Sequence, residues 1–309
     1  MHIVKGKKVS WIDIHRPTKD DIEYLRKTYK FHPVILEELK QPSFRARVEH
    51  YDDYLFLVFH MPHYDFATRT SVKREIDFLI TKDSIITVHH DRLEAFEIFE
   101  RTLEKNANVR ERAFEKSSGV LLYYLVNSIH DFSIRQLHHI EEKVGSLTKD
   151  ILGKNEYEML ERISYAKREI LDYQIISEPQ KILLDSLREV GLQFWGENLR
   201  IYLTDLIGDQ AKIAQRLETY SRIVESLENT NTQLLSTHTN TIMQRFTILA
   251  FLTFPIVLYT GFFSPFFEIQ PGPQTPVSPK IFLIGLFALF VIIVCIAGTL
   301  IALKKKRWF

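Results

Sequence analysis

Cysteine and glycine are scarce in this chain, and neither sign of charge predominates. A single cysteine, Cys295, among 309 residues excludes an intramolecular disulfide and any metal site built from several cysteines. The 11 glycines form neither a P-loop nor a dinucleotide-binding run, so the usual nucleotide fingerprints are absent. A formal net charge of +1 argues against a nucleic-acid partner that is bound through bulk positive charge.

Arrangements of catalytic side chains are missing as well. The sequence shows no Ser/His/Asp, Cys/His or paired-carboxylate pattern of the kind that nucleophilic or acid–base catalysis needs. Adjacent histidines such as His138 and His139 point in different directions on a helix, where ligands of one metal stand three or four residues apart. We therefore predict that the chain is not an enzyme.

Strongly apolar sequence is concentrated near the C-terminal end. No charged residue occurs from 246 to 267 or from 281 to 303. Because a helix needs about 20 apolar residues to cross the hydrocarbon core of a bilayer, each run is long enough to span it. The alternative is a buried helical hairpin in the core of a soluble protein. We predict a two-helix membrane domain, 246–309, whose outer loop is 268–280.

Prolines and basic residues around the two runs determine the predicted topology. Several prolines lie between the runs and cannot continue a helix, which makes that segment a loop. Four consecutive cations, 304–307, follow the second run directly and hold that end in the cytoplasm. Two spans return the chain to its starting side, so residues 1–245 are predicted to be cytoplasmic, and the first residues lack the apolar stretch of a signal peptide. We predict a multi-pass protein of the cell membrane (inner or plasma membrane).

The cytoplasmic part is predicted to hold two regions. Residues 1–115 are mixed α/β, because runs of strand length and composition alternate with segments of helical spacing. The expected strands are 9–14, 54–61, 74–81 and 84–89, and the expected helices are 18–29 and 33–40. Residues 116–245 are helical, with Pro179 at a helix end or a kink.

A heptad pattern of apolar residues follows in the second region. Its members alternate spacings of four and three over residues 199–238, as in helices that pack along their lengths. The pattern runs into the first apolar run, so we predict one stalk helix from Gly196 to near Gly261, roughly 100 Å long at 1.5 Å per residue. Its polar members Gln210, Asn231 and His238 either set the register between subunits or are tolerated in a wet seam.

Short motifs in a fixed order run through the chain. They are Trp11-Ile12-Asp13, Phe31 to Leu39, Arg47 to Val58, Asp77 to Ile80 with Ile85 to His89, Leu121 to Leu125, and the closing Lys304 to Trp308. Their order and spacing resemble those of the CorA family of magnesium transporters over essentially the whole chain. The resemblance implies a funnel-shaped homopentamer in the lipid bilayer. Each subunit then has an α+β cytoplasmic domain, a long stalk helix and two C-terminal transmembrane helices, and the five first spans line one central pore.

The chain departs from the family at its signature. The family carries Tyr-Gly-Met-Asn at the outer end of the first span, where the asparagine oxygens receive a hydrated cation. Aligned on Pro255 and Gly261, that position holds Phe263-Ser264-Pro265-Phe266, which matches none of the four residues. The first hypothesis is a divalent-cation channel for Mg²⁺, Co²⁺ or Zn²⁺ with altered selectivity, whose ring is relaxed or built from Ser264, Glu268 or loop carbonyls. A channel for another ion and a non-transporting, membrane-anchored sensor or scaffold are the alternatives.

Further positions correspond to the pore of the family. Asn240 keeps a polar ring at the cytoplasmic end, whereas Phe254 and Val257 make the pore more apolar, with constrictions that gate by dewetting. Phe246 also matches a lining position, but we favour helix packing as its role. The candidate pore and selectivity residues are Asn240, Met243, Phe254, Val257, Gly261, Ser264, Phe266 and Glu268.

Two carboxylates match a regulatory site of the family. Its members close when Mg²⁺ occupies an acidic site between neighbouring cytoplasmic domains, and the matching motifs place Glu38 and Asp205 there. We predict that these two acids bind Mg²⁺ or another divalent cation between subunits, because the cation neutralises carboxylates that otherwise repel one another. The alternative is that they are solvated surface acids, which is our interpretation of Glu37 and Asp209. The implied partners are further copies of the chain, the bilayer and divalent cations.

Overall fold

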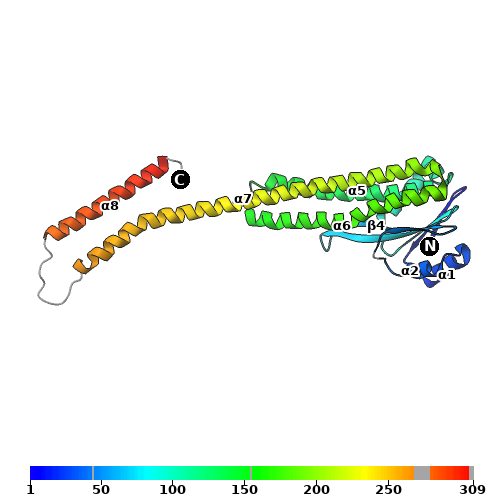
Figure 1. The fold of residues 1–309 in the computed structure, drawn as a ribbon, viewed down its shortest axis with the longest axis horizontal. Coiled ribbons are helices and arrows are strands. Elements are labelled where there is room, and N and C mark those ends of the chain that lie inside the picture. The colour runs from blue at the N-terminus through cyan, green and yellow to red at the C-terminus, as the bar shows by residue number, and fades with distance from the viewer. Residues whose placement is uncertain (44, 154, 268–278, 306–309) are drawn as a thin grey trace. The chain divides into compact units, whose positions relative to one another are not determined.

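The structure is a computed structural model, and it describes residues 1–309 except 44, 154, 268–278 and 306–309. The chain divides into two compact units, Met1–Asn231 and Thr232–Phe309. The first unit contains a sheet and several helices (Figure 1). The second is helical throughout its described residues.

A six-stranded sheet forms the centre of the first unit. Its order is β1 (His2–Lys5), β2 (Ser10–His15), β6 (Ser84–His89), β5 (Thr70–Ile80), β4 (Leu55–Asp65) and β3 (Arg47–His50). Strands β2 and β6 are parallel, and the other neighbours are antiparallel. The four strands predicted from the sequence are confirmed, and β4 and β5 are longer than expected. The sequence does not predict the edge strands β1 and β3, because four residues with charged ends carry too weak a signal.

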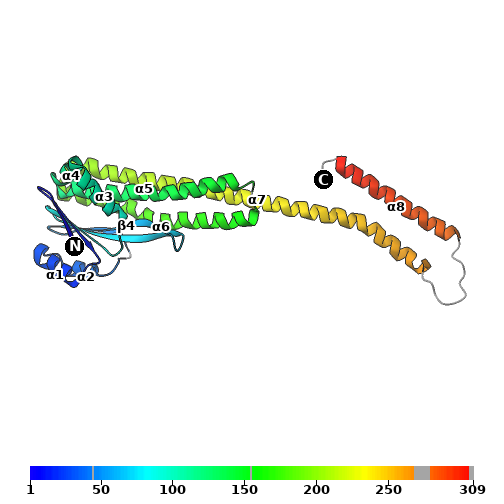
Figure 2. The same cartoon turned by 180° about the vertical axis from the view of Figure 1, so that it is seen from behind.

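Both faces of the sheet are buried. Alternate side chains of β4 point to opposite faces, and Leu57 and Val58 are each fully buried, in different cores. Figures 1 and 2 show α1 (Lys19–Tyr29) and α2 (Pro33–Glu38) on one side of the sheet and α5 (Ser118–Asp150) and α6 (Glu156–Trp195) on the other. Because both faces are covered, the central strands read as continuous apolar runs rather than as alternating polar and apolar residues.

Helices make up the rest of the described chain. They are α3 (Glu94–Lys105), α4 (Ala107–Phe114), α5 (Ser118–Asp150), α6 (Glu156–Trp195), a 3₁₀ turn (Glu197–Leu199), α7 (Arg200–Phe267) and α8 (Pro279–Lys305). Thr18 and Asp21 form a capping box at the start of α1: the Thr18 hydroxyl accepts from the Asp21 amide, and the Asp21 carboxylate accepts from the Thr18 amide. The long helix is confirmed as α7, separated from α6 by Gly196 at a φ of 91°. Helix α6 continues through Pro179, which is therefore not a helix end.

The heptad pattern of α7 packs against its own subunit. Its apolar members within residues 199–227 belong to two cores that α7 shares with α5 and α6. Gln210 is 3% exposed and donates its amide to the carbonyl and the hydroxyl of Ser177 on α6, at 2.8 and 2.9 Å. The hypothesis that Gln210 sets the register between subunits is therefore wrong, because its hydrogen bonds are made within one chain.

This arrangement predicts the effect of Gln210→Ala. Loss of the amide leaves buried polar atoms of Ser177 without their partner, so the free energy of unfolding should fall by about 1–3 kcal/mol. Chemical unfolding of the full chain, followed by circular dichroism, measures the change. The exposed Gln215, on the same helix, provides the control Gln215→Ala, which should change stability by less than about 0.5 kcal/mol. Equal stability of the two variants would contradict the assignment.

Candidate ion pathway and cytoplasmic carboxylate cluster

One stripe of α7 carries five of the predicted pore residues. They are Asn240, Met243, Phe254, Val257 and Gly261, and all are exposed in the single chain. Their spacings approximate whole helical turns, which places them on one side of the helix. Phe254 is 63% exposed and Val257 is 64% exposed. Apolar side chains exposed to this extent indicate a surface that lipid or further protein covers.

Polar side chains in the apolar part of α7 are satisfied within the helix. Thr247, Thr253 and Thr260 each donate the hydroxyl to a backbone carbonyl three or four residues earlier. Because hydrocarbon offers no hydrogen-bond partners, such internal bonds make the segment compatible with a bilayer. Among the described residues, 197–261 is long and apolar enough to cross a membrane, and 283–298 of α8 is apolar but shorter.

The structure does not describe the side chains of the predicted selectivity filter. Ser264 and Phe266 lie in the final turns of α7, and the helix continues through Pro265 to Phe267. The side chains of these residues are not among those described, and Glu268 lies outside the described residues altogether. The contribution of this segment to ion selectivity therefore stays a prediction.

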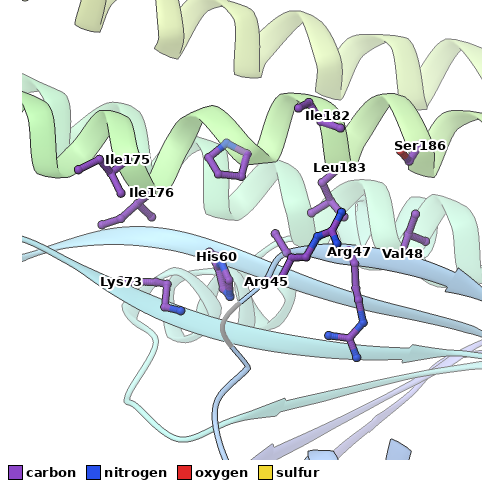
Figure 3. Close-up of a pocket in the computed structure, with 12 residues that line it drawn as sticks. Arg45, Arg47, Val48, His60, Lys73, Ile175, Ile176, Ile182, Leu183 and Ser186 are labelled. Atoms are coloured by element: carbon purple, nitrogen blue, oxygen red, sulfur yellow. The ribbon is translucent and has the colours of Figure 1, made fainter.

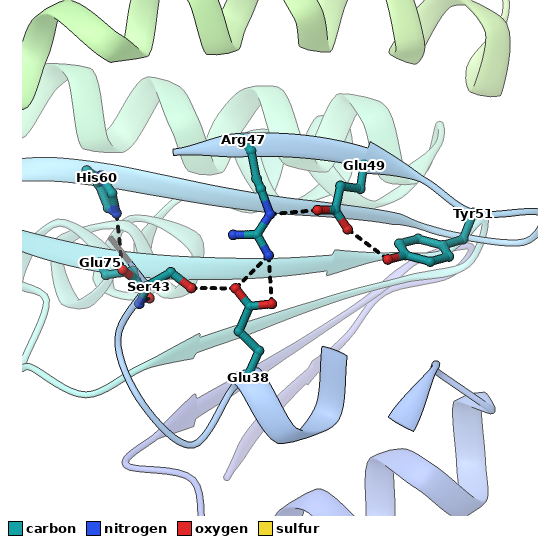
Figure 4. A network of polar contacts seen from close by, with 7 residues as sticks. All are labelled: Glu38, Ser43, Arg47, Glu49, Tyr51, His60 and Glu75. Atoms are coloured by element: carbon teal, nitrogen blue, oxygen red, sulfur yellow. Dashed lines mark hydrogen bonds and ion pairs between the residues drawn. The ribbon is translucent and has the colours of Figure 1, made fainter. Parts of the chain in front are cut away.

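The first carboxylate of the predicted regulatory site is bound by its own chain. Glu38 ends α2, and Arg47 at the start of β3 donates from one nitrogen to both oxygens of Glu38, at 2.5 and 2.7 Å (Figure 4). The Ser43 hydroxyl donates to the same carboxylate at 2.6 Å. Through Nε, Arg47 also donates to Glu49 at 2.6 Å, and Glu49 accepts from the hydroxyl of Tyr51. One guanidinium thus neutralises two acids.

Arg47 also holds Glu38 in its ionised form. Burial raises the pKa of the Glu38 carboxyl, but the hydrogen bonds from Arg47 and Ser43 outweigh burial and leave this pKa below its ordinary value of 4.5. A divalent cation that binds Glu38 must therefore displace Arg47 or share the carboxylate with it. The sequence motif that carries Glu38 does not reveal this contact, because Arg47 lies on another element.

A second group of buried polar side chains lies on the same face of the sheet. His60 Nε2 lies 3.1 Å from one oxygen of Glu75, and the other oxygen of Glu75 accepts from the Ser43 amide at 2.6 Å (Figure 4). Asp77, two residues further along β5, is 2% exposed, and its Oδ1 has no hydrogen-bond partner among the described residues. Burial, together with the charges of Glu75 and Glu38, raises the pKa of Asp77 well above its ordinary value.

The second predicted carboxylate lies on α7. Asp205 accepts a hydrogen bond from the Tyr123 hydroxyl on α5 at 2.8 Å, and burial together with this acid raises the pKa of Tyr123. Helices α2 and α7 pack on opposite faces of the sheet, and in the described part of one chain no recorded contact joins Asp205 to Glu38. Nor do the described residues include three or more His, Cys, Asp or Glu side chains placed to hold a metal. Within the described part of one chain, Glu38 and Asp205 therefore do not form a common site.

The pKa of Asp77 predicts that asparagine at this position stabilises the protein at neutral pH. Because the folded-state pKa is raised, stability falls as the pH rises above the ordinary value of 3.8 towards the folded-state pKa. Asp77→Asn removes this loss and should raise the free energy of unfolding at pH 7 by about 1 kcal/mol or more. Urea unfolding from about pH 4 to pH 8 measures the dependence. The exposed Asp83 provides the control Asp83→Asn; an Asp77→Asn variant with an unchanged pH dependence would contradict the assignment.

Comparison with known proteins gives one family. The profile of the CorA-like Mg²⁺ transporter protein matches residues 6–300. The cobalt/magnesium transport protein CorA of Thermotoga maritima is 24% identical over 303 residues, which cover 97% of this chain and 83% of that protein. The cobalt/magnesium transport protein CorA of Methanocaldococcus jannaschii is 21% identical over 270 residues, covering 87% and 83%. The complete structure of the CorA magnesium transporter from M. jannaschii matches with a TM-score of 0.79 at 18% identity, covering 99% of this chain and 93% of that one.

The match extends over both compact units. It includes strands β2 to β6, the helices of the first unit, and α7 with most of α8. The family consists of membrane transporters, which confirms that the chain is not an enzyme. The resemblance read from the short sequence motifs is likewise confirmed, since the profile match covers more than half of the chain: the protein belongs to the CorA-like Mg²⁺ transporter family.

Proposed function

We propose that this protein is a divalent-cation channel of the CorA type whose selectivity is altered at the outer mouth. The profile match over residues 6–300 carries the proposal, because it includes the helix with the pore stripe as well as the cytoplasmic unit. A match confined to the cytoplasmic unit would support a sensor or scaffold equally well. Transport is therefore favoured over the non-transporting alternative.

The proposed assembly is a homopentamer that spans the bilayer with both ends in the cytoplasm. Each subunit comprises an α/β region (1–115), a helical region with the stalk (116–245) and a membrane domain (246–309). Equivalent α7 stripes face a common axis, which covers the apolar side chains that are exposed in one chain. The Asn240 amides then form a polar ring, and Phe254 forms an apolar constriction.

Ligand chemistry motivates the altered selectivity. Mg²⁺ prefers oxygen ligands and gives up its water reluctantly, so a ring of amide oxygens suits it. Phe266 offers no oxygen at the position of the family's asparagine. We propose that Ser264, Glu268 and loop carbonyls receive the cation instead, with Mg²⁺, Co²⁺ and Zn²⁺ as the candidate substrates.

The same cations are proposed to regulate the channel through Glu38 and Asp205 of neighbouring subunits. In each chain Arg47 occupies both oxygens of Glu38, so it competes with the cation for this carboxylate. Competition raises the cation concentration at which the site fills. The sensitivity of the channel is therefore proposed to depend on Arg47 as well as on the acids.

Ion flux tests the transport proposal. Purified protein in liposomes should take up at least one of Mg²⁺, Co²⁺ and Zn²⁺, measured with an ion-sensitive dye in the lumen. Replacing Phe263-Ser264-Pro265-Phe266 with Tyr-Gly-Met-Asn should raise Mg²⁺ flux relative to Co²⁺ flux by about tenfold, because it restores a ring of amide oxygens.

Two controls make this measurement decisive. CorA of Thermotoga maritima in parallel liposomes shows that the assay works. Leu249→Ala changes an exposed residue on the opposite side of α7 from the pore stripe and should leave the Mg²⁺/Co²⁺ ratio unchanged. No uptake of any of the three ions beside the working control would refute transport.

Arg47→Gln tests the regulatory proposal. Removing the competing guanidinium should lower the Mg²⁺ concentration that halves the flux by about tenfold, equivalent to about 1.4 kcal/mol. The control Lys40→Gln removes a cation whose partner is Glu37, outside the proposed site. In the double variant with Glu38→Gln the gain should disappear. A Mg²⁺ dependence that Arg47→Gln leaves unchanged, in protein with normal flux, would show that Glu38 does not sense the cation.

A further inference from the structure

A pocket of about 630 Å³ lies where the edge of the sheet meets α6. Strand β3 begins at Arg47, which pairs with Val58, whereas β4 continues to Asp65. Beyond Val58, β4 pairs with β5 on one edge, and no described strand pairs with its other edge. Figure 3 shows the resulting space between the start of β3, strands β4 and β5, and α6. Its volume lies within the range of small-molecule sites, roughly 300–1,000 Å³.

The open edge of β4 is closed by a side chain rather than by a strand. The His60 amide donates to the Gln180 side-chain oxygen on α6 at 3.3 Å, and the Gln180 amide donates to the carbonyl of Ile176. An added peptide strand would have to displace the Gln180 side chain from the His60 amide. The pocket therefore suits a small molecule rather than a strand of another chain.

The polar wall of the pocket is cationic. Its positive charges come from Arg45, Arg47 and Lys73, and none of the described lining residues is acidic. The guanidinium of Arg47 is already bound by two carboxylates. Arg45 is exposed and makes no hydrogen bond or ion pair with another described residue. Its charge is therefore available to an anion in the pocket.

The opposite wall is apolar and solvent-exposed. Ile175 is 69% exposed and Ile182 is 73% exposed, and both lie on α6 beside Pro179 (Figure 3). Proline has no N–H, so the carbonyl of Ile175, four residues earlier, lacks its helical donor. An apolar group placed against this wall would shield the two isoleucines from water.

We propose that this pocket binds a small organic anion. Arg45 holds its phosphate or carboxylate group, and Lys73, whose Nζ also donates to the Ser43 carbonyl at 3.1 Å, adds positive charge beside it. The apolar body of the anion rests against Ile175 and Ile182. The cationic wall binds the anionic group of such a ligand, and the apolar wall binds its apolar body. A ligand that has both groups should therefore bind more tightly than one that has only one of them. The proposal does not depend on ion transport, and its test measures binding only.

Isothermal titration of the full chain in phosphatidylcholine nanodiscs with phenyl phosphate tests the proposal. Saturable binding at one site per chain is expected, and inorganic phosphate, which lacks the apolar body, should bind at least about tenfold more weakly. Arg45→Gln should weaken phenyl phosphate binding by about tenfold, the effect of one charge-assisted hydrogen bond. Ile182→Ser should weaken it by about threefold or more.

The matched control is Lys181→Gln, which removes an exposed cation of α6 that is adjacent in sequence to Ile182 but does not line the pocket. It should change the affinity by less than about twofold. Weaker phenyl phosphate binding in discs that contain phosphatidylglycerol would show that an anionic lipid headgroup competes for the pocket and is the source of its anionic ligand. No saturable binding, or equal affinity of wild type and Arg45→Gln, would overturn the proposal.

Discussion

The structure depends on helix α7, whose first part packs in the protein core and whose later part is exposed in the single chain. The first part of α7 buries an apolar seam against α5 and α6, whereas most of its large apolar side chains from residue 242 to residue 258 are exposed. An α-helix can make this change because its backbone bonds are internal and hold equally in water, in a protein core and in hydrocarbon. The first part is complete within one chain, whereas the second still needs lipid or further subunits to cover it.

Charge balance governs the face of the sheet that α2 covers. Glu38, Glu49, Glu75 and Asp77 lie close together there, and unpaired buried carboxylates are costly. Arg47 binds two of them, and His60 with the Ser43 amide binds Glu75. Among the described residues Asp77 receives no such partner, and its raised pKa favours the neutral form. A cation that binds one of these carboxylates must therefore compete with the hydrogen bonds and ion pairs that the carboxylate already makes within the chain.

The periodicity of apolar residues predicts the long helix and the central strands. It does not predict the short edge strands, nor which side chains from distant elements form hydrogen bonds with one another. The four central strands and the long helix both follow from local patterns. The short edge strand β3 carries no clear pattern, and so Arg47 and its contact with Glu38 stay hidden. The heptad seam correctly predicts that α7 packs along its length, but spacing does not identify the partner helix. Gln210 shows the consequence, since its partner Ser177 lies in the same chain.

The proposed departure from the family's signature is confined to Phe263-Ser264-Pro265-Phe266, whereas the family match extends over residues 6–300. Scaffold and selectivity place different demands on a sequence: many residues share the packing of the sheet and helices, while few side chains contact an ion. A channel can therefore exchange its filter residues and keep the helices that position them. Helix α7 remains regular through Pro265, so the altered residues occupy the end of an intact helix. The proposed change of ion preference therefore requires no change in the helices that the family match covers.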